Sequence, residues 1–152
     1  MKIEDSFIVQ APRDRVWAAI IDPARIAPCI PGCESIEISG PNCYRARVSI
    51  AVGPIKAAFN LEVEVTEETP PSFLASTTRG EEGTRASVLT AHNELHLKTL
   101  EDGSTEVRYV SDVSIVGRLG RFGLGVMKKK AAALGVEFAE AFRARVERGE
   151  AA

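Results

Sequence analysis

The last part of the sequence constrains the fold most, because residues 118–148 contain no proline and repeat their apolar residues at helical spacing. At a rise of about 1.5 Å per residue, a stretch of this length makes a helix of roughly 45 Å. Placed at about 100° per residue, its apolar side chains cover an arc of roughly 200°, opposite Arg121, Lys128 and Arg143. These apolar residues are Leu119, Phe122, Val126, Met127, Ala133, Leu134, Phe138, Ala141 and Phe142. A face this wide predicts a long terminal helix held in the grip of a sheet.

Most of the preceding sequence alternates between apolar and polar residues, which is the signature of strands with one buried face. A first strand is expected around residues 2–9, and six more follow residue 33. They are expected near 36–38, 44–52, 55–65, 72–81, 85–98 and 104–116. The turn pairs Glu82-Gly83 and Asp102-Gly103 separate the last three, so these strands should be antiparallel neighbours.

Between the first two strands, proline and aspartate mark two short helices. Pro12 with Asp14, and then Asp22 with Pro23, are typical of helix starts, and Pro28 is expected to end the second helix. The predicted fold is therefore α+β, with the order strand, two helices, six strands, helix. Long twisted strands wrap around the terminal helix and leave an internal apolar cavity.

Composition indicates one soluble domain, residues 1–152, because this length buries a substantial core and the net charge is only -2. The balance of charge argues against a protein that coats nucleic acid. The start MKIEDSF does not resemble a secretory signal, and no run approaches the roughly 18 apolar residues of a membrane span. Three cysteines without CxxC spacing favour a reducing cytoplasm.

Two stretches resemble a known family. The order of elements is similar to the START-type helix-grip fold, and APRDRVWAAIIDPARIAPCIPGCESIE is similar to the CoxG family of carbon monoxide dehydrogenase subunits. The second matching stretch is VGRLGRFGLGVMKKKAAALGVEFAEAFRARVE. The more specific elements are the sequence CIPGCE at residues 29–34 and the glycines 117, 120 and 123 before the last helix.

The resemblance implies a non-catalytic accessory protein of carbon monoxide dehydrogenase-type molybdenum hydroxylases. Such a protein would bind a lipid or a quinone-like molecule and recruit the enzyme to the inner face of the membrane or deliver an electron acceptor. It would hold no other cofactor. Longer family members carry a C-terminal extension that can contact the membrane, whereas this sequence ends at Ala152, so the resemblance gives no basis for expecting anchoring of that kind.

Two other function classes fit the same fold. One is a small-molecule enzyme that resembles the polyketide cyclases and aromatases of the superfamily, and the other is an interaction module whose cavity is filled by side chains. Asp5 and Asp112 are the candidates for an acid or base, but a position at a strand edge or in a surface pair is the preferred interpretation. No catalytic constellation is visible, so we expect no enzyme activity.

Metal binding is also disfavoured. Cys29, Cys33 and Cys43 lack a fourth ligand at zinc-site spacing and are interpreted as structural. His92, Glu94 and His96 alternate along one strand, but residues two apart lie roughly 6.6 Å from each other, so a solvated sheet face is the preferred interpretation.

The cavity is predicted to be lined by inward-facing residues of the strands and of the terminal helix. These ligand-binding candidates are Phe59, Leu61, Phe73, Leu89, Leu95, Phe122, Val126 and Met127. Methionine gives such a wall the freedom to adapt to different ligands.

A basic and apolar segment is predicted to contact an anionic membrane or a partner protein, because no acid occurs between Val113 and Val136. An ordinary solvated helix face remains the alternative. The candidates are Arg118, Arg121, Leu124, Lys128, Lys129 and Lys130. The four glycines between residues 117 and 125 also predict a mobile gate here, since each interior glycine costs a helix roughly 0.8 to 1.0 kcal/mol against alanine.

Overall fold

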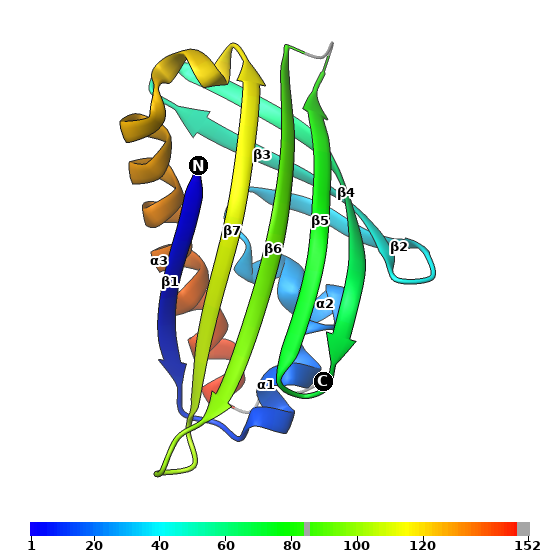
Figure 1. Cartoon of the computed structure of the whole chain (residues 1–152), viewed down its shortest axis with the longest axis vertical. Helices are drawn as coiled ribbons and strands as arrows, with labels where there is room; N and C mark the ends of the chain where they lie inside the picture. The colour runs from blue at the N-terminus through cyan, green and yellow to red at the C-terminus, as the bar shows by residue number, and fades with distance from the viewer. Residues whose placement is uncertain (84–85, 149–152) are drawn as a thin grey trace.

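A computed structural model of the chain describes residues 1–83 and 86–148, and shows one curved antiparallel sheet with three helices behind it (Figure 1). The strands are β1 (Lys2–Val9), β2 (Cys33–Gly40), β3 (Cys43–Val52), β4 (Ile55–Thr69), β5 (Phe73–Glu82), β6 (Ser87–Thr99) and β7 (Thr105–Gly117). The helices are α1 (Arg13–Ile20), α2 (Pro23–Ile26) and α3 (Leu124–Glu147), with short 3-10 turns η1 (Ala27–Cys29) and η2 (Leu119–Phe122). The α+β helix-grip prediction is confirmed.

The strand order in the sheet is β1-β7-β6-β5-β4-β3-β2, with every neighbouring pair antiparallel. The six consecutive strands pair in chain order, as the short turns predict. Their predicted bounds agree to within a few residues. The expected start of one strand at residue 85 lies outside the described residues, as do 149–152 of the predicted domain. Strand β1 joins the sheet at β7, from Lys2 opposite Asp112 to Val9 opposite Thr105.

The two short helices begin where the sequence predicts, and α2 ends at Ile26, before Pro28, as the sequence also predicts. The Asp22 carboxylate accepts a hydrogen bond from the Ala24 N–H at 3.0 Å and so caps α2. The chain then continues through Pro28 as η1, because proline at the second position of a 3-10 turn needs no N–H donor there.

The terminal helix is shorter than predicted. Gly123 has a φ of 84°, so the chain leaves helical geometry and α3 begins only at Leu124. The preceding residues form η2, in which Gly120 sits close to the sheet: a Cβ there would lie 2.8 Å from the Ile115 carbonyl oxygen. The prediction of one helix over 118–148 was therefore wrong at its start, and three of the four glycines serve a tight turn rather than a weakened helix.

The buried side chains form two separate clusters at opposite ends of the concave face. The cluster beside α1 includes Val9, Trp17, Leu97 and Phe142, and partly buried Phe7 packs against it with its ring 6.3 Å from that of Phe142. The second cluster comprises Val52, Ala57, Phe59 and Leu119, with partly buried neighbours from β3, β4, β6, β7 and α3. The middle of the concave face lies between these two cores.

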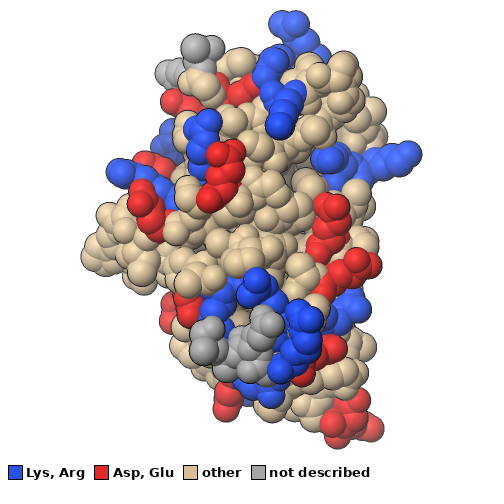
Figure 2. Space-filling view, turned by 180° about the vertical axis from the view of Figure 1, so that it is seen from behind, with Lys and Arg blue, Asp and Glu red and all other residues tan. Residues whose placement is uncertain are grey.

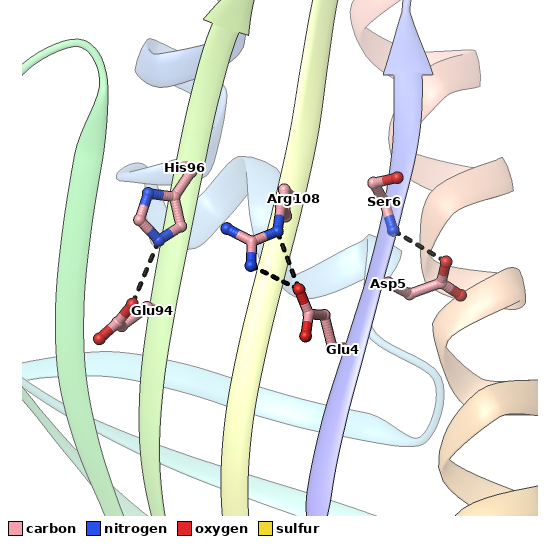
Figure 3. A network of polar contacts seen from close by, with 6 residues as sticks. All are labelled: Glu4, Asp5, Ser6, Glu94, His96 and Arg108. Carbon is pink, nitrogen blue, oxygen red and sulfur yellow. Dashed lines mark hydrogen bonds and ion pairs between the residues drawn. The ribbon is translucent and has the colours of Figure 1, made fainter.

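Polar side chains contact one another on the outer face of the sheet (Figure 3). The Arg108 guanidinium donates hydrogen bonds to the Glu4 carboxylate across β7 and β1, and it lowers the pKa of that carboxyl. On β6, the His96 ring lies 3.2 Å from a Glu94 oxygen. These contacts are exposed to solvent, which screens them, so they contribute little to stability.

Candidate functional site

A pocket of about 260 Å³ opens on the concave face between the short helices and strands β2 to β5. Its lining is mainly aliphatic, and Glu68, which is exposed, is the one charged residue among its lining residues. The lining residues are Ile20, Ile21, Pro23, Ile26, Ile30, Ile36, Tyr44, Ala46, Val48, Leu61, Val63, Val65, Glu68, Leu74, Ser76 and Thr78. An apolar concavity with a few polar groups is the usual form of a small-molecule site.

The local sequence explains why these side chains converge. On β3 and β4 every second residue faces the concave side, so Ala46 lies opposite Leu61 and Tyr44 opposite Val63. The end of α1 and the proline-started α2 place isoleucines over these strands. The pocket is therefore roofed by the two short helices and floored by the sheet.

One side of the floor carries a cluster of four polar side chains, Ser76, Thr78, Asn93 and Ser111. The Asn93 amide nitrogen donates to the Ser76 hydroxyl at 3.3 Å and to the Thr78 hydroxyl at 3.0 Å. The Ser111 hydroxyl donates to the Asn93 amide oxygen at 2.9 Å. The register places Ser76, Asn93 and Ser111 directly opposite one another on β5, β6 and β7. All four are half-buried, and Ser76 and Thr78 line the pocket.

Tyr109 lies between this region and α3. It is half-buried, and both burial and the nearby charge of Asp5 raise the pKa of its phenol. Its hydroxyl oxygen meets the helix at Gly135, where a Cβ would overlap it, while the ring carbon Cζ would lie 3.6 Å from that Cβ. The absence of a side chain at Gly135 thus sets how closely α3 approaches β7.

Five of the eight predicted ligand-binding residues lie in or against the second cluster, the one that contains Leu119. Phe59, Leu61, Leu89, Phe122 and Met127 belong to or pack against that cluster. Phe59 is only 1% exposed and so forms part of the packed interior. Leu61 alone among the eight predicted residues also lines the pocket.

The other three predicted residues lie elsewhere. Leu95 packs against the cluster beside α1. Phe73 is on the opposite face of β5 from Leu74, which lines the pocket, and its ring lies 5.0 Å from that of His96. Val126 is 48% exposed on α3. The set of eight therefore does not surround a single cavity.

The residues predicted to contact a membrane or partner divide into a fixed and an exposed part. Arg118 pairs with the buried Glu82, its N–H donates to the Ala86 carbonyl at 2.9 Å, and the neighbouring Leu119 is 1% exposed. Leu124, the first residue of α3, is 58% exposed. The cations Arg121, Lys128 and Lys129 are exposed, and Lys130 is half-buried. Whether this segment acts as a mobile gate stays a prediction.

Figure 2 shows the face that carries the helices. An uncharged area crosses its middle, and Lys and Arg side chains gather toward its upper and lower ends. The uncharged middle of this face agrees with the position of the pocket between the two cores.

The candidates for acid–base chemistry lie outside the pocket. Asp5 is exposed on the edge strand and accepts a hydrogen bond from the Ser6 N–H at 2.8 Å (Figure 3). Asp112 is 75% exposed and lies 3.7 Å from the N-terminal ammonium. His92 and His96 are on the outer face of β6.

The three cysteines differ in how deeply they are buried. Cys29 is buried, whereas Cys33 and Cys43 are half-buried, and burial raises the pKa of the Cys33 thiol. Among residues 1–83 and 86–148, no group of three or more His, Cys, Asp or Glu side chains could hold a metal ion.

A larger hollow of about 690 Å³ lies over the outer side of strands β2 to β6. It is lined by charges of both signs, including Arg45 and Glu62, whose closest atoms are 3.8 Å apart. This charged surface lacks the aliphatic lining of the pocket on the concave face, so we place the candidate binding site in the smaller pocket.

Sequence reasoning missed the polar cluster. Its signal was present: Asn93 occupies an inward position between Ala91 and Leu95, and Ser111 occupies one between Tyr109 and Val113. Polar residues at positions that otherwise face the core need partners, and several of them together indicate a functional surface.

Several solved structures share this architecture over nearly the whole chain. A conserved protein from Geobacillus kaustophilus is 23% identical, with 97% of this chain and 96% of that one covered, and a TM-score of 0.90. A START superfamily protein from Mycobacterium smegmatis is 16% identical, with 97% of each chain covered, and a TM-score of 0.75. The Zhui aromatase/cyclase from Streptomyces sp. R1128 is 19% identical, with 97% and 94% covered, and a TM-score of 0.70.

These neighbours show that the chain has a START-like helix-grip fold. The family follows from the sequence: residues 6–147 match the family described as the G subunit of carbon monoxide dehydrogenase (CoxG), and the chain belongs to that family. A search of curated proteins gives no match. Within the described residues, no helix is long and apolar enough to cross a membrane.

Proposed function

We propose that this protein is a non-catalytic carrier of a lipophilic small molecule, which it binds in the pocket between α1, α2 and strands β2 to β5. The observation that carries the proposal is the mainly aliphatic lining of a pocket left between two packed cores. Its volume of about 260 Å³ is slightly below the usual range for drug-sized ligands, so a long apolar tail would extend through the opening.

The residues that line the pocket favour ligand binding over catalysis. The polar groups in the pocket are mainly hydroxyls, and those of Ser76 and Thr78 hydrogen bond to the neutral amide of Asn93 rather than to a base. A cyclase or aromatase activity is the alternative function in this fold. Product formation from a polyketide-type substrate, lost on substitution of a residue that lines the pocket, would favour that alternative.

A fluorescence titration with the neutral apolar dye phenylnaphthylamine tests the proposal. We expect saturable binding by the parent protein and its loss in Ala46→Trp, because the indole would occupy the pocket from β3. Ala51→Trp is the matched control, since Ala51 is on the same strand and exposed. Equal binding by both variants would show that the dye occupies another site, and no saturable binding by the parent would refute the carrier function.

Membership of the CoxG family supports a more specific role for the carrier. The ligand would be a quinone-like electron acceptor or a lipid, and the partner a carbon monoxide dehydrogenase-type molybdenum hydroxylase. Addition of the protein should then accelerate reduction of a membrane-held quinone by such an enzyme, and Ala46→Trp should not. If the two proteins have equal effects, delivery of the acceptor is refuted even if dye binding persists.

The exposed start of α3 supports a second role, peripheral contact with anionic lipid. Leu124 and Val126 are 58% and 48% exposed and stand beside the exposed cations Arg121, Lys128 and Lys129. Apolar side chains flanked by cations are the features that peripheral membrane binding uses. Contact at the inner face of the cell membrane would bring the pocket near its lipophilic ligand.

A further inference from the structure

The polar cluster on the pocket floor has an unused hydrogen-bonding capacity. Each hydroxyl of Ser76 and Thr78 accepts a hydrogen bond from the Asn93 amide nitrogen. A hydroxyl that accepts in this way still has its own proton to donate. Both hydroxyls belong to residues that line the pocket, so both protons are available to a molecule inside it.

The hydrogen bonds also hold the cluster in place. The Asn93 amide uses both of its N–H donors on Ser76 and Thr78, and its oxygen accepts from Ser111 on the other neighbouring strand. Three strands thus position the two hydroxyls before any ligand arrives. Such preorganisation reduces the entropy lost when a ligand binds.

The charges around the pocket restrict the head group. None of the described residues that line it is lysine or arginine, and the one acid, Glu68, is exposed. A carboxylate or phosphate would lose its hydration without gaining a cation, so an anionic head group is disfavoured. A neutral oxygen acceptor can use two hydroxyl donors without that cost.

We propose that Ser76, Thr78, Asn93 and Ser111 form the head-group subsite of the pocket and select a neutral lipophilic molecule that carries a hydrogen-bond acceptor, such as a carbonyl oxygen. Ser76 and Thr78 donate to the acceptor, and Asn93 and Ser111 position them. The aliphatic walls hold the body of the molecule. This inference rests on the proposed carrier function and adds to it the chemical class of ligand and the residues that select it.

Three aromatic probes of nearly equal shape test the selection: acetylnaphthalene, ethylnaphthalene and naphthoate. They present a neutral carbonyl, no acceptor and an anion, and each is measured by displacement of bound phenylnaphthylamine. For the parent protein we expect acetylnaphthalene to bind more tightly than ethylnaphthalene by about five- to tenfold, the effect of roughly one net hydrogen bond. Naphthoate should bind more weakly than acetylnaphthalene.

Thr78→Val keeps the shape of the side chain and removes its donor, so it should abolish most of the preference for acetylnaphthalene over ethylnaphthalene. Ser76→Ala provides an independent second variant. Thr77→Val is the matched control, because Thr77 lies on the same strand and lines a hollow on the outer face instead of the pocket. Thermal unfolding of each variant checks that the fold is retained.

Loss of the preference in Thr78→Val or Ser76→Ala, with the preference retained in Thr77→Val, supports the subsite. Equal affinities for acetylnaphthalene and ethylnaphthalene in the parent would overturn it while leaving the carrier function intact. Tighter binding of naphthoate would overturn the selection for a neutral head group. If the parent does not bind the dye or any probe, both the carrier function and the subsite are refuted.

Discussion

The contact between Gly135 and Tyr109 gives a prediction that tests how the sheet holds the terminal helix. An alanine at position 135 would place its Cβ against the Tyr109 hydroxyl oxygen. We therefore expect Gly135→Ala to push the phenol or the helix out of position. The same substitution should be harmless once the hydroxyl is removed by Tyr109→Phe, because the nearest remaining ring atom would lie 3.6 Å away.

Two opposing terms determine the size of the effect. Alanine is favoured over glycine in a helix interior by roughly 0.8 to 1.0 kcal/mol. Overpacking costs about 1 to 3 kcal/mol. Gly135→Ala alone should thus destabilise the protein by up to about 2 kcal/mol, and in the Tyr109→Phe background it should stabilise it by about 1 kcal/mol. The expected coupling energy between the two positions is about 1 to 3 kcal/mol.

Urea unfolding of the parent, the two single variants and the double variant measures this coupling. Gly125→Ala is the control, because a Cβ at Gly125 would meet nothing within 4 Å, and its effect should not depend on residue 109. A coupling energy of zero would show that Tyr109 does not support the helix at Gly135. The described packing of α3 on β7 would then be incorrect.

Four further predictions concern the site and its surroundings. Leu119→Ala should lower the free energy of unfolding by about 2 to 5 kcal/mol because Leu119 is 1% exposed, whereas Leu124→Ala should change it by less than about 0.5 kcal/mol because Leu124 is 58% exposed. Flotation with anionic liposomes should decrease for Leu124→Ala and for a variant with glutamine at positions 121, 128 and 129, and equal flotation of the parent and both variants would refute the membrane contact. Alanine at Asp5, Asp112, His92 or His96 should leave dye affinity within a few-fold of the parent, while a reaction product lost in one of them would favour an enzyme. Burial raises the pKa of the Tyr109 phenol above its usual 10.0. The neutral phenol therefore stabilises the folded state fully below pH 10.0, and this contribution is lost as the pH rises through the raised pKa. Tyr109→Phe should thus lessen the decrease in stability at alkaline pH.

The order of elements could be predicted because each depends on local chemistry. Alternation along β4 and β6 identifies strands, and Asp22 with Pro23 identifies a helix start, without knowledge of the rest of the chain. The end of a helix is harder to locate. Gly123 has a positive φ and follows η2, in which Gly120 lies close to the Ile115 carbonyl oxygen, and that tertiary contact is not visible in the sequence.

The position of the pocket depended on geometry that the sequence does not contain. Periodicity identifies which residues face inward, but not which part of the concave face the helices leave uncovered. Phe59 faces inward as predicted and yet belongs to the second buried cluster, against which Met127 packs. The isoleucines of α1 and α2 line the pocket because those short helices cover β2 to β5, a placement that only the folded chain shows.

The central claim is that the inner pocket carries a lipophilic molecule, and mass spectrometry of an organic extract of the purified protein tests it most directly. We predict that the parent and Ala51→Trp yield the same neutral, carbonyl-bearing molecule in proportion to the protein. Ala46→Trp, with its pocket filled, should yield none. Recovery of the same molecule in equal amount from Ala46→Trp would contradict the claim, because the molecule would then bind outside the pocket.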